Sequence, residues 1–263
     1  MRIGFIGCGN MAKAILKGIV AKGLFPVSEV IAADQSAEAL EVVRKELGIQ
    51  VTKDNKEVAR AEILVLAVKP FHFETVISEI RDYVAPDQLI ISIAAGQTIE
   101  NIERFFEKDI CLIRTMPNTP ALVGAGAAGI CKNKYVSEQQ LQTAIDIFSS
   151  FGIAEVVSEK MIDTVIGVSG SSPAYVFMFI EAMADAAVAD GMPRAQAYRF
   201  AAQAVLGSAK MVLETGKHPG ELKDMVCSPA GTTIEAVKVL EEKGLRSAVI
   251  EAQMACVERA KNM

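Results

Sequence analysis

The first twelve residues, MRIGFIGCGNMA, constrain this chain more than any other stretch of it. The apolar run 2–6 predicts a strand, Gly7 and Gly9 predict a tight turn, and the spacing of apolar residues over 14–20 predicts a helix. In such a unit the first glycine permits the turn, the second lets the backbone approach a diphosphate, and a small third residue, here Ala12, packs helix on strand. Free N–H groups at the helix start would hold the phosphates. The stretch therefore predicts a dinucleotide site, with a plain strand-to-helix turn as the alternative.

An acid follows the second predicted strand. Residues 29–33 form a short apolar run that ends at Asp34, about where folds of this kind place a carboxylate for the adenosine ribose hydroxyls. Taken alone, Asp34 favours NAD(H), because a carboxylate repels the 2′-phosphate of NADP(H). Gln35 and Ser36 could donate hydrogen bonds to that phosphate, so the choice of cofactor stays open. Asp34 or Ser36 as the N-cap of a helix over 37–47 is an alternative that could hold at the same time.

Two longer apolar runs predict central strands whose carboxyl ends meet at one edge of a sheet. The run 62–68 is typical of a parallel strand buried on both faces, and the run 88–93 repeats the pattern. Ligands bind at this edge in doubly wound sheets, so the loop after the first run is a candidate cofactor contact, with a plain turn as the alternative. Small residues at 94–96 would let a ring or a ribose come close. The candidate contacts at this edge are Ala67, Val68, Lys69, Pro70 and Ala95.

Strands that alternate with helices in this way predict an α/β Rossmann-type N-terminal domain, which we place at residues 1–158. Its last strands are expected at 126–131 and 153–157. They lie around a helix that begins with a capping box from Ser137 to Gln140.

From residue 159 onward the strand patterns stop, and helical patterns rich in alanine and methionine follow. The expected helices span 159–168, 173–189, 194–214, 232–242 and 245–261. The pattern predicts an all-α C-terminal domain over residues 159–263. Its broad apolar faces favour burial against another subunit, with packing inside the domain as the alternative.

Composition excludes several classes of partner. A net charge of −5 and a pI near 5.3 lack the basic footprint of nucleic-acid binding. The richest apolar run, 173–188, is interrupted by Glu181 and Asp185, so we expect no membrane span. The early glycine turn stands where a leader would have its apolar core, so we expect a cytoplasmic protein. The five cysteines are scattered without a C-x-x-C pair, which predicts neither a disulfide framework nor a metal site.

The most unusual peptide of the helical half is CSPAGTT, at 227–233. Thr232 and Glu235 have capping-box spacing, which predicts a well-capped helix. The two hydroxyls and the backbone N–H groups of this turn also fit a carboxylate-binding nest at a helix start. Both hold together if one threonine caps the helix and the other faces the ligand. A second Ser/Gly turn, at 167–173, is taken as structural.

These segments together resemble the pyrroline-5-carboxylate reductase family. The resemblance covers essentially the whole chain, and its last motif is highly specific. The segments that carry it are IGCGNMA, AVKP, SIAAG, RTMPNTPA at 114–121, GVSGSSPAY at 167–175 and LKDMVCSPAGTTIEAVKVLE at 222–241. The resemblance implies reduction of the cyclic imine 1-pyrroline-5-carboxylate to L-proline, the last step of proline biosynthesis. It also implies a homodimer paired through the helical domain, and leaves open whether dimers assemble into a higher oligomer.

The resemblance also implies a role for single residues. The residues around the pyrophosphate are Gly7, Cys8, Gly9, Asn10, Met11 and Ala12, and those near the cofactor's ribose and nicotinamide are Ala67, Val68, Lys69, Pro70 and Ala95. Asn55 matches a position near the adenosine. The substrate loop is Ser228, Gly231, Thr232 and Thr233, with Thr233 as the catalytic hydrogen-bond donor to the ring nitrogen. The implied cofactor is NADPH, with NADH usable. Asp34 departs from the many members that prefer NADPH.

The implied chemistry agrees with a chain that has two histidines, His72 and His218. A protonated cyclic imine is already a strong electrophile, so hydride delivery needs positioning and carboxylate anchoring more than a strong acid. We expect neither histidine to act as an acid or base. One alternative is a hydroxyacid dehydrogenase, which needs a catalytic Lys or His that the helical half does not offer. Another is a nucleotide-binding dimer without enzyme activity.

Overall fold

The computed structural model describes residues 2–262 and is built on an eight-stranded sheet of order β3-β2-β1-β4-β5-β6-β7-β8. Strands β1 to β6 run parallel, in the Rossmann order. Strand β7 is antiparallel to β6, and β8 is parallel to β7. The strands are β1 (Ile3–Ile6), β2 (Val30–Ala33), β3 (Gln50–Thr52), β4 (Ile63–Leu66), β5 (Leu89–Ser92), β6 (Cys111–Pro117), β7 (Gly126–Lys132) and β8 (Gly152–Val156). The predicted strand positions and the Rossmann-type fold are confirmed.

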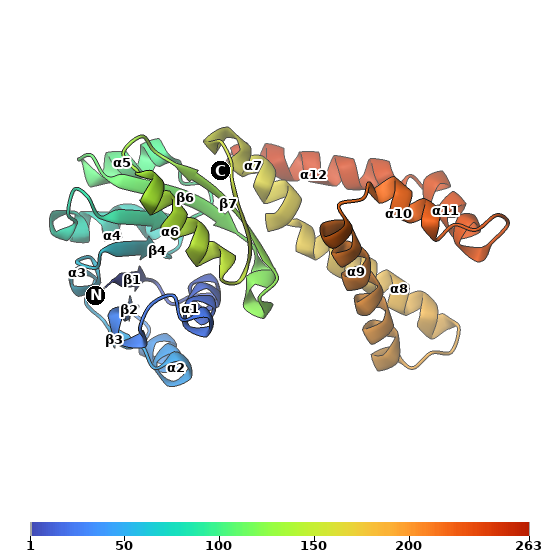
Figure 1. Ribbon diagram of the computed structural model, residues 1–263, viewed down its shortest axis with the longest axis horizontal. Coiled ribbons are helices and arrows are strands. Elements are labelled where there is room, and N and C mark those ends of the chain that lie inside the picture. The colour runs from blue at the N-terminus through green and yellow to red at the C-terminus, as the bar shows by residue number, and fades with distance from the viewer. Residues whose placement is uncertain (1, 263) are drawn as a thin grey trace. The chain divides into compact units, whose positions relative to one another are not determined.

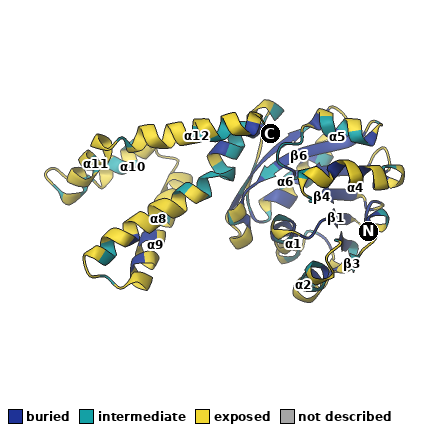
Figure 2. Cartoon of the chain, turned by 180° about the vertical axis from the view of Figure 1, so that it is seen from behind, coloured by how far each residue is buried: buried dark blue, intermediate teal, exposed yellow. Residues whose placement is uncertain are grey.

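Alternation along the strands sends side chains to two cores, one on each face of the sheet. In β4, Ile63 and Val65 join one core, and Leu64 and Leu66 join the other. Helices cover both faces (Figure 1), and the sheet between them is buried (Figure 2). The first core is covered by α1 (Asn10–Lys22), α2 (Ala37–Leu47) and α6 (Glu138–Ser149), and the second by α3 (Asn55–Val58), α4 (Phe73–Ile80) and α5 (Ile99–Phe106). Because both faces of the central strands are covered, β1, β2 and β4 are apolar and fully buried.

Strand register places the ligand-binding edge. Ile6 at the end of β1 pairs with Ala33 of β2 on one side and with Leu66 of β4 on the other. Leu66 in turn pairs with Ser92 at the end of β5. The loops after these strands therefore leave the sheet side by side, as the sequence predicts.

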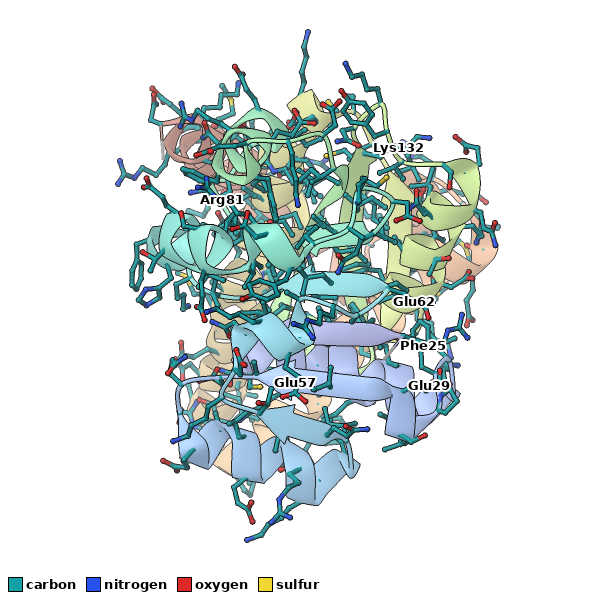
Figure 3. The ribbon with its side chains drawn as sticks, turned by 90° about the vertical axis from the view of Figure 1, so that its left-hand side faces the viewer. Phe25, Glu29, Glu57, Glu62, Arg81 and Lys132 are labelled. Carbon is teal, nitrogen blue, oxygen red and sulfur yellow. The ribbon has the colours of Figure 1, made fainter. Side chains whose placement is uncertain are left out.

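The opposite edge, where the strands begin, is closed by side chains. Figure 3 shows Phe25, Glu29 and Glu62 gathered at this end. The Arg2 guanidinium lies 5.5 Å from the Phe25 ring, and its Nε lies 3.8 Å from a carboxylate oxygen of Glu29 and of Glu62. Pairs this long and this exposed contribute little to stability.

Helix starts follow the expected chemistry at two places. Ser137 and Gln140 form the predicted capping box of α6, with both reciprocal hydrogen bonds present. Ser36 caps α2, because its hydroxyl accepts from the N–H of Ala39. Short 3₁₀ turns lie at η1 (Val27–Glu29), η2 (Pro70–His72), η3 (Arg81–Tyr83), η4 (Thr119–Val123) and η5 (Glu159–Met161).

The chain forms two compact units, residues 1–171 with 257–263, and residues 172–256. The first unit includes α7 (Ile162–Val165) and the π-helical turn Ile166–Gly170, beyond the predicted boundary at 158. Contacts with the sheet explain why. Ile162 is buried in the second core, and buried Arg114 of β6 forms an ion pair with Glu159 at 3.0 Å.

The second unit is helical, as predicted. Its helices are α8 (Ser172–Ala189), α9 (Arg194–Thr215), α10 (Pro219–Met225), α11 (Thr232–Glu242) and the greater part of α12 (Leu245–Lys261). The helices expected from the sequence did not include α10. Pro219 has the fixed φ that a first helical turn needs, and His218 Nδ1 accepts from the N–H of Gly220.

Most of this unit is exposed (Figure 2), and its exposed residues include large apolar ones. Phe177 is 63% exposed, Met178 69% and Leu213 73%. Within residues 2–262 one stretch, Glu159–Ala189, is long and apolar enough to cross a membrane by length and composition alone. An apolar surface of this extent needs a partner.

Candidate active site

The turn between β1 and α1 is held tightly against the end of β4. Gly7 has φ +104°, and a Cβ at this position would lie 2.6 Å from the carbonyl oxygen of Ala67. The Gly7 N–H donates to Ala33 O at 2.8 Å, which ties the turn to β2 as well. Only glycine fits both the left-handed backbone and the close approach.

Gly9 has a different role from Gly7, because its backbone conformation does not require glycine. It is the N-cap of α1 with φ −68° and ψ 179°, a conformation open to any residue. Among residues 2–262 no heavy atom outside its neighbours lies within 4 Å of a Cβ built here. That Cβ would instead project into space that borders two cavities. Because Gly9 has no side chain, the backbone surface at the start of α1, which we call the glycine ledge, stays open to a ligand.

Two cavities border the carboxyl edge of the sheet and share the wall made by Gly9 and the loop after β4. The first has a volume of about 470 Å³ and is lined by Ile6, Gly7, Gly9, Ala33, Asp34, Gln35, Asn55, Ala67, Val68, Lys69, His72, Thr75, Val76 and Glu79. The second, of about 610 Å³, is lined by Gly9, Asn10, Met11, Ala12, Ala67, Val68, Lys69, Pro70, Ile93, Ala94, Ala95, Thr119 and Leu122. A ligand with two halves joined by a diphosphate fits such a pair of cavities, with its phosphates over the start of α1.

The Asp34 carboxylate braces the glycine turn. Its Oδ2 accepts from the N–H of Cys8 at 2.7 Å, and its Oδ1 accepts from the N–H of Ser36 at 2.8 Å. The cap of α2 is Ser36, so of the two capping alternatives the one for Asp34 is wrong and the one for Ser36 is confirmed. Because Asp34 also lines the first cavity, one carboxylate serves both the turn and the cavity wall.

Cys8 faces the protein rather than a ligand. Its Sγ lies 3.8 Å from Ala33 O, and burial raises the pKa of its thiol to about 12, with the neighbouring Asp34 charge as the second cause. The thiol is therefore neutral at neutral pH and adds no negative charge beside a diphosphate.

The structure brings most of the predicted cofactor residues together at the two cavities, whereas Cys8 and Ser36 do not line them. The sequence did not reveal the contributions of His72 at the end of η2, of Thr75, Val76 and Glu79 on α4, and of Thr119 and Leu122 in the segment after β6. The rule that ligands bind beyond the carboxyl ends of strands, applied to β6 as it was to β4, would have found Thr119 and Leu122.

The predicted substrate residues lie in the second unit. The N–H of Gly231 donates to Ser228 O at 3.0 Å, and Ala230 between them has φ +57°, which is unusual for a residue with a Cβ. A Cβ on Gly231 would collide with Ser228 Oγ. The turn is therefore tightly folded, with Ser228 and Thr232 exposed and Thr233 half-buried.

The predicted capping box at this turn is wrong. The N-cap of α11 is Gly231, which places Thr232 and Thr233 at the first two helical positions, and within the described chain no side chain caps this helix start. Thr232 is already the first helical residue, one position past the N-cap, so its side chain does not cap the helix. The first N–H groups of α11 are thus left without a side-chain acceptor, which is a suitable arrangement for an anionic ligand.

Comparison with known proteins decides the family. A family model described as pyrroline-5-carboxylate reductase dimerisation matches residues 159–263, and one described as NADP oxidoreductase, coenzyme F420-dependent, matches residues 2–96. The Escherichia coli (strain K12) protein named pyrroline-5-carboxylate reductase is 55% identical over 263 residues, which cover 100% of this chain and 98% of that protein. The chain belongs to the pyrroline-5-carboxylate reductase family.

Solved structures agree along the whole chain. A pyrroline-5-carboxylate reductase from Coxiella burnetii has a TM-score of 0.94 and 39% identity, over 99% of this chain and 97% of that one. A Plasmodium falciparum pyrroline carboxylate reductase with NADP bound has a TM-score of 0.89 and 32% identity, over 100% of this chain and 97% of that one. The glycine ledge, the two joined cavities and the helix start between them fit the nicotinamide dinucleotide that enzymes of this family use. Within residues 2–262 no group of three or more His, Cys, Asp or Glu side chains could hold a metal ion.

Proposed function

We propose that this chain reduces 1-pyrroline-5-carboxylate to L-proline with a nicotinamide dinucleotide as the hydride donor. The observation that carries the proposal is the end-to-end match, at 55% identity, to a protein named for this reaction. The test is an assay of NADPH oxidation by the purified chain with 1-pyrroline-5-carboxylate. A hydroxyacid dehydrogenase would instead oxidise an open-chain hydroxy acid, and a nucleotide-binding dimer would bind NADPH without oxidising it.

The chemistry needs little from acidic or basic side chains. Hydride adds to the carbon of the C=N bond, the electron pair of that bond moves to nitrogen, and the nitrogen carries one proton into the product. The chain's task is to hold the imine against the nicotinamide. We assign the carboxylate of the substrate to the turn 228–233, where the uncapped start of α11 offers N–H groups and the positive end of a helix dipole. We assign to Thr233 the hydrogen bond to the ring nitrogen.

For the cofactor we propose NADPH, with NADH also accepted. The Asp34 carboxylate stands in the first cavity, where its charge opposes a 2′-phosphate. Its oxygens already accept from Cys8 and Ser36, but a carboxylate offers about four lone-pair sites, so ribose hydroxyls can still bind it. Asp34 thereby reduces a preference for NADPH without blocking it.

Replacing Asp34 by serine is expected to raise the ratio of kcat/KM for NADPH to that for NADH about tenfold, or about 1.4 kcal/mol, because the opposing charge is removed. Stability should fall by about 1–2 kcal/mol, since two backbone N–H groups lose their acceptor. Initial rates with each cofactor and a thermal melt measure the two effects. Glu38→Gln, which removes a charge from the first turn of α2 outside the cavity, is the matched control. An unchanged ratio in Asp34→Ser removes Asp34 from the choice of cofactor.

We propose further that two copies of the chain pair through the helical unit. The exposed apolar side chains of α8 and α9 support this, as does the family description of residues 159–263 as a dimerisation segment. A lipid surface is the rival partner for the stretch Glu159–Ala189. However, that stretch begins with Ile162 buried on the sheet and with Glu159 paired to Arg114, which a membrane span could not combine. Light scattering behind a sizing column should give twice the chain mass in the absence of detergent, and a monomer would contradict the proposal.

A further inference from the structure

A buried amide and an acidic side chain meet on the wall of the first cavity. Asn55, the first residue of α3, is 5% exposed. Its Nδ2 donates to Oε2 of Glu79 at 2.9 Å, across 24 positions of sequence. Both residues line the cavity, Asn55 from α3 and Glu79 from α4. Neither the glycine turn nor the substrate turn accounts for this contact.

The contact fixes which atom of Asn55 a ligand meets. A carboxylate only accepts hydrogen bonds, so it holds the amide with the NH₂ group toward itself and the oxygen away. Within residues 2–262 no group donates a hydrogen bond to Asn55 Oδ1. This oxygen is also not fully enclosed by protein atoms. This oxygen therefore keeps some accessible surface, on a residue that lines the cavity. The flipped amide would bring Oδ1 against the Glu79 carboxylate, two acceptors facing each other.

We propose that Glu79 is a positioning residue for the cofactor. It holds Asn55 with the carbonyl oxygen toward the cavity, so that this wall selects a hydrogen-bond donor of the adenosine half: a ribose hydroxyl or the 6-amino group of adenine. The inference rests on the dinucleotide-binding part of the proposed function. Asp34 on the same cavity is also an acceptor, whereas an ionised phosphate carries acceptors only and gains no hydrogen bond from either residue.

The test measures binding rather than turnover. With NADPH and no imine present, calorimetric titration of Glu79→Ala should give a Kd about 5- to 10-fold above that of the unaltered protein, because Asn55 loses its fixed orientation. Glu79→Gln should stay within about twofold, since its amide oxygen can still accept from Asn55 Nδ2. In turnover assays the loss should appear as a raised KM for NADPH in Glu79→Ala and should be largely recovered in Glu79→Gln. Glu74→Ala, on the same helix but outside the first cavity, is the control and should bind as the unaltered protein does.

A double-mutant cycle separates positioning from other effects. Asn55→Ala should weaken binding as Glu79→Ala does, and the double variant should be no weaker than Asn55→Ala alone. If Glu79→Ala weakens binding equally in the Asn55→Ala background, the two residues act independently and the proposal is overturned. Should Asn55→Ala not fold, the comparison of Glu79→Ala with Glu79→Gln decides, and equal losses in these two overturn the proposal.

A further arm identifies the donor group. NADH and its hypoxanthine analogue, which lacks the 6-amino group, are titrated into the unaltered protein and Glu79→Ala. If the unaltered protein discriminates the two and the variant does not, the 6-amino group is the donor. If Glu79→Ala weakens both equally, the donor is a ribose hydroxyl. Because no imine is present, a protein that fails to reduce 1-pyrroline-5-carboxylate but shows this pattern refutes the proposed reaction and leaves the role of Glu79 standing.

Discussion

Replacing Gly9 by alanine is expected to weaken NADPH binding about 30-fold while the fold remains. Among the described residues nothing lies in the path of a new Cβ, so the protein tolerates it. The Cβ fills the glycine ledge shared by the two cavities and keeps the diphosphate from the start of α1. We expect this to cost about 2 kcal/mol of binding free energy. Alanine is a poorer N-cap than glycine, so a small loss of stability, below about 1 kcal/mol, accompanies the change.

Gly7→Ala supplies the contrast, because it should damage the fold itself. Position 7 has φ +104°, and its Cβ would meet a backbone carbonyl oxygen at 2.6 Å, which no side-chain rotation can relieve. We expect the free energy of unfolding to fall by more than about 3 kcal/mol, because alanine strains the left-handed backbone and its Cβ pushes β4 away from β1. Thermal melts and calorimetric NADPH titration of both variants make the comparison. A Gly9→Ala protein that binds NADPH normally would show that the diphosphate does not cross this ledge.

Removing the hydroxyl of Thr233 is expected to lower kcat/KM for 1-pyrroline-5-carboxylate about 100-fold. The substitution Thr233→Val keeps the shape and the β-branch but cannot hydrogen-bond the ring nitrogen. Loss of a bond to the lone pair that forms on this nitrogen in the transition state costs roughly 2.7 kcal/mol. Thr233→Ser keeps the hydroxyl and should stay within about threefold. Position 233 is half-buried and no side-chain cap depends on it, so both variants should fold.

Three readouts separate this role from a structural one. NADPH affinity without substrate should be the same in both Thr233 variants, since every residue of the two cofactor cavities lies in the other unit. Melting temperatures should agree within about 2 °C. Of the three quantities, only kcat/KM for the imine should fall in Thr233→Val. A valine variant that turns over as fast as the serine variant would remove Thr233 from the mechanism.

Sequence patterns predicted many helices and strands of the Rossmann unit because these elements depend on residues close to one another in the sequence. The helix 37–47 was predicted to the residue, and the capping box of α6 needs only the four residues Ser137 to Gln140. The glycine turn was found because its glycines stand in a short sequence motif between a predicted strand and a predicted helix, although the close contact at Gly7 is with the distant Ala67.

What the sequence did not reveal depends on distant residues. The bond from Cys8 to Asp34 joins residues 26 positions apart, and that from Asn55 to Glu79 joins residues 24 apart. Periodicity reports which residues of a helix face a core, but it does not report which exposed acid meets which amide. The direction of β7 was predictable in principle. The chain between Pro117 and Gly126 is too short for the crossover that a parallel neighbour of β6 requires.

The helical unit has a consequence for how the molecule reaches its native state. Within residues 172–256 the buried apolar residues are Ala184, Ala197 and Ala201, which are too small to supply a core of their own. The first unit contains two extensive cores and can fold in a first-order step at any dilution. If two copies pair as proposed, the second unit gains apolar burial by meeting another copy, and its consolidation is then a bimolecular event. Refolding should therefore have two phases, of which only the later one speeds up with protein concentration.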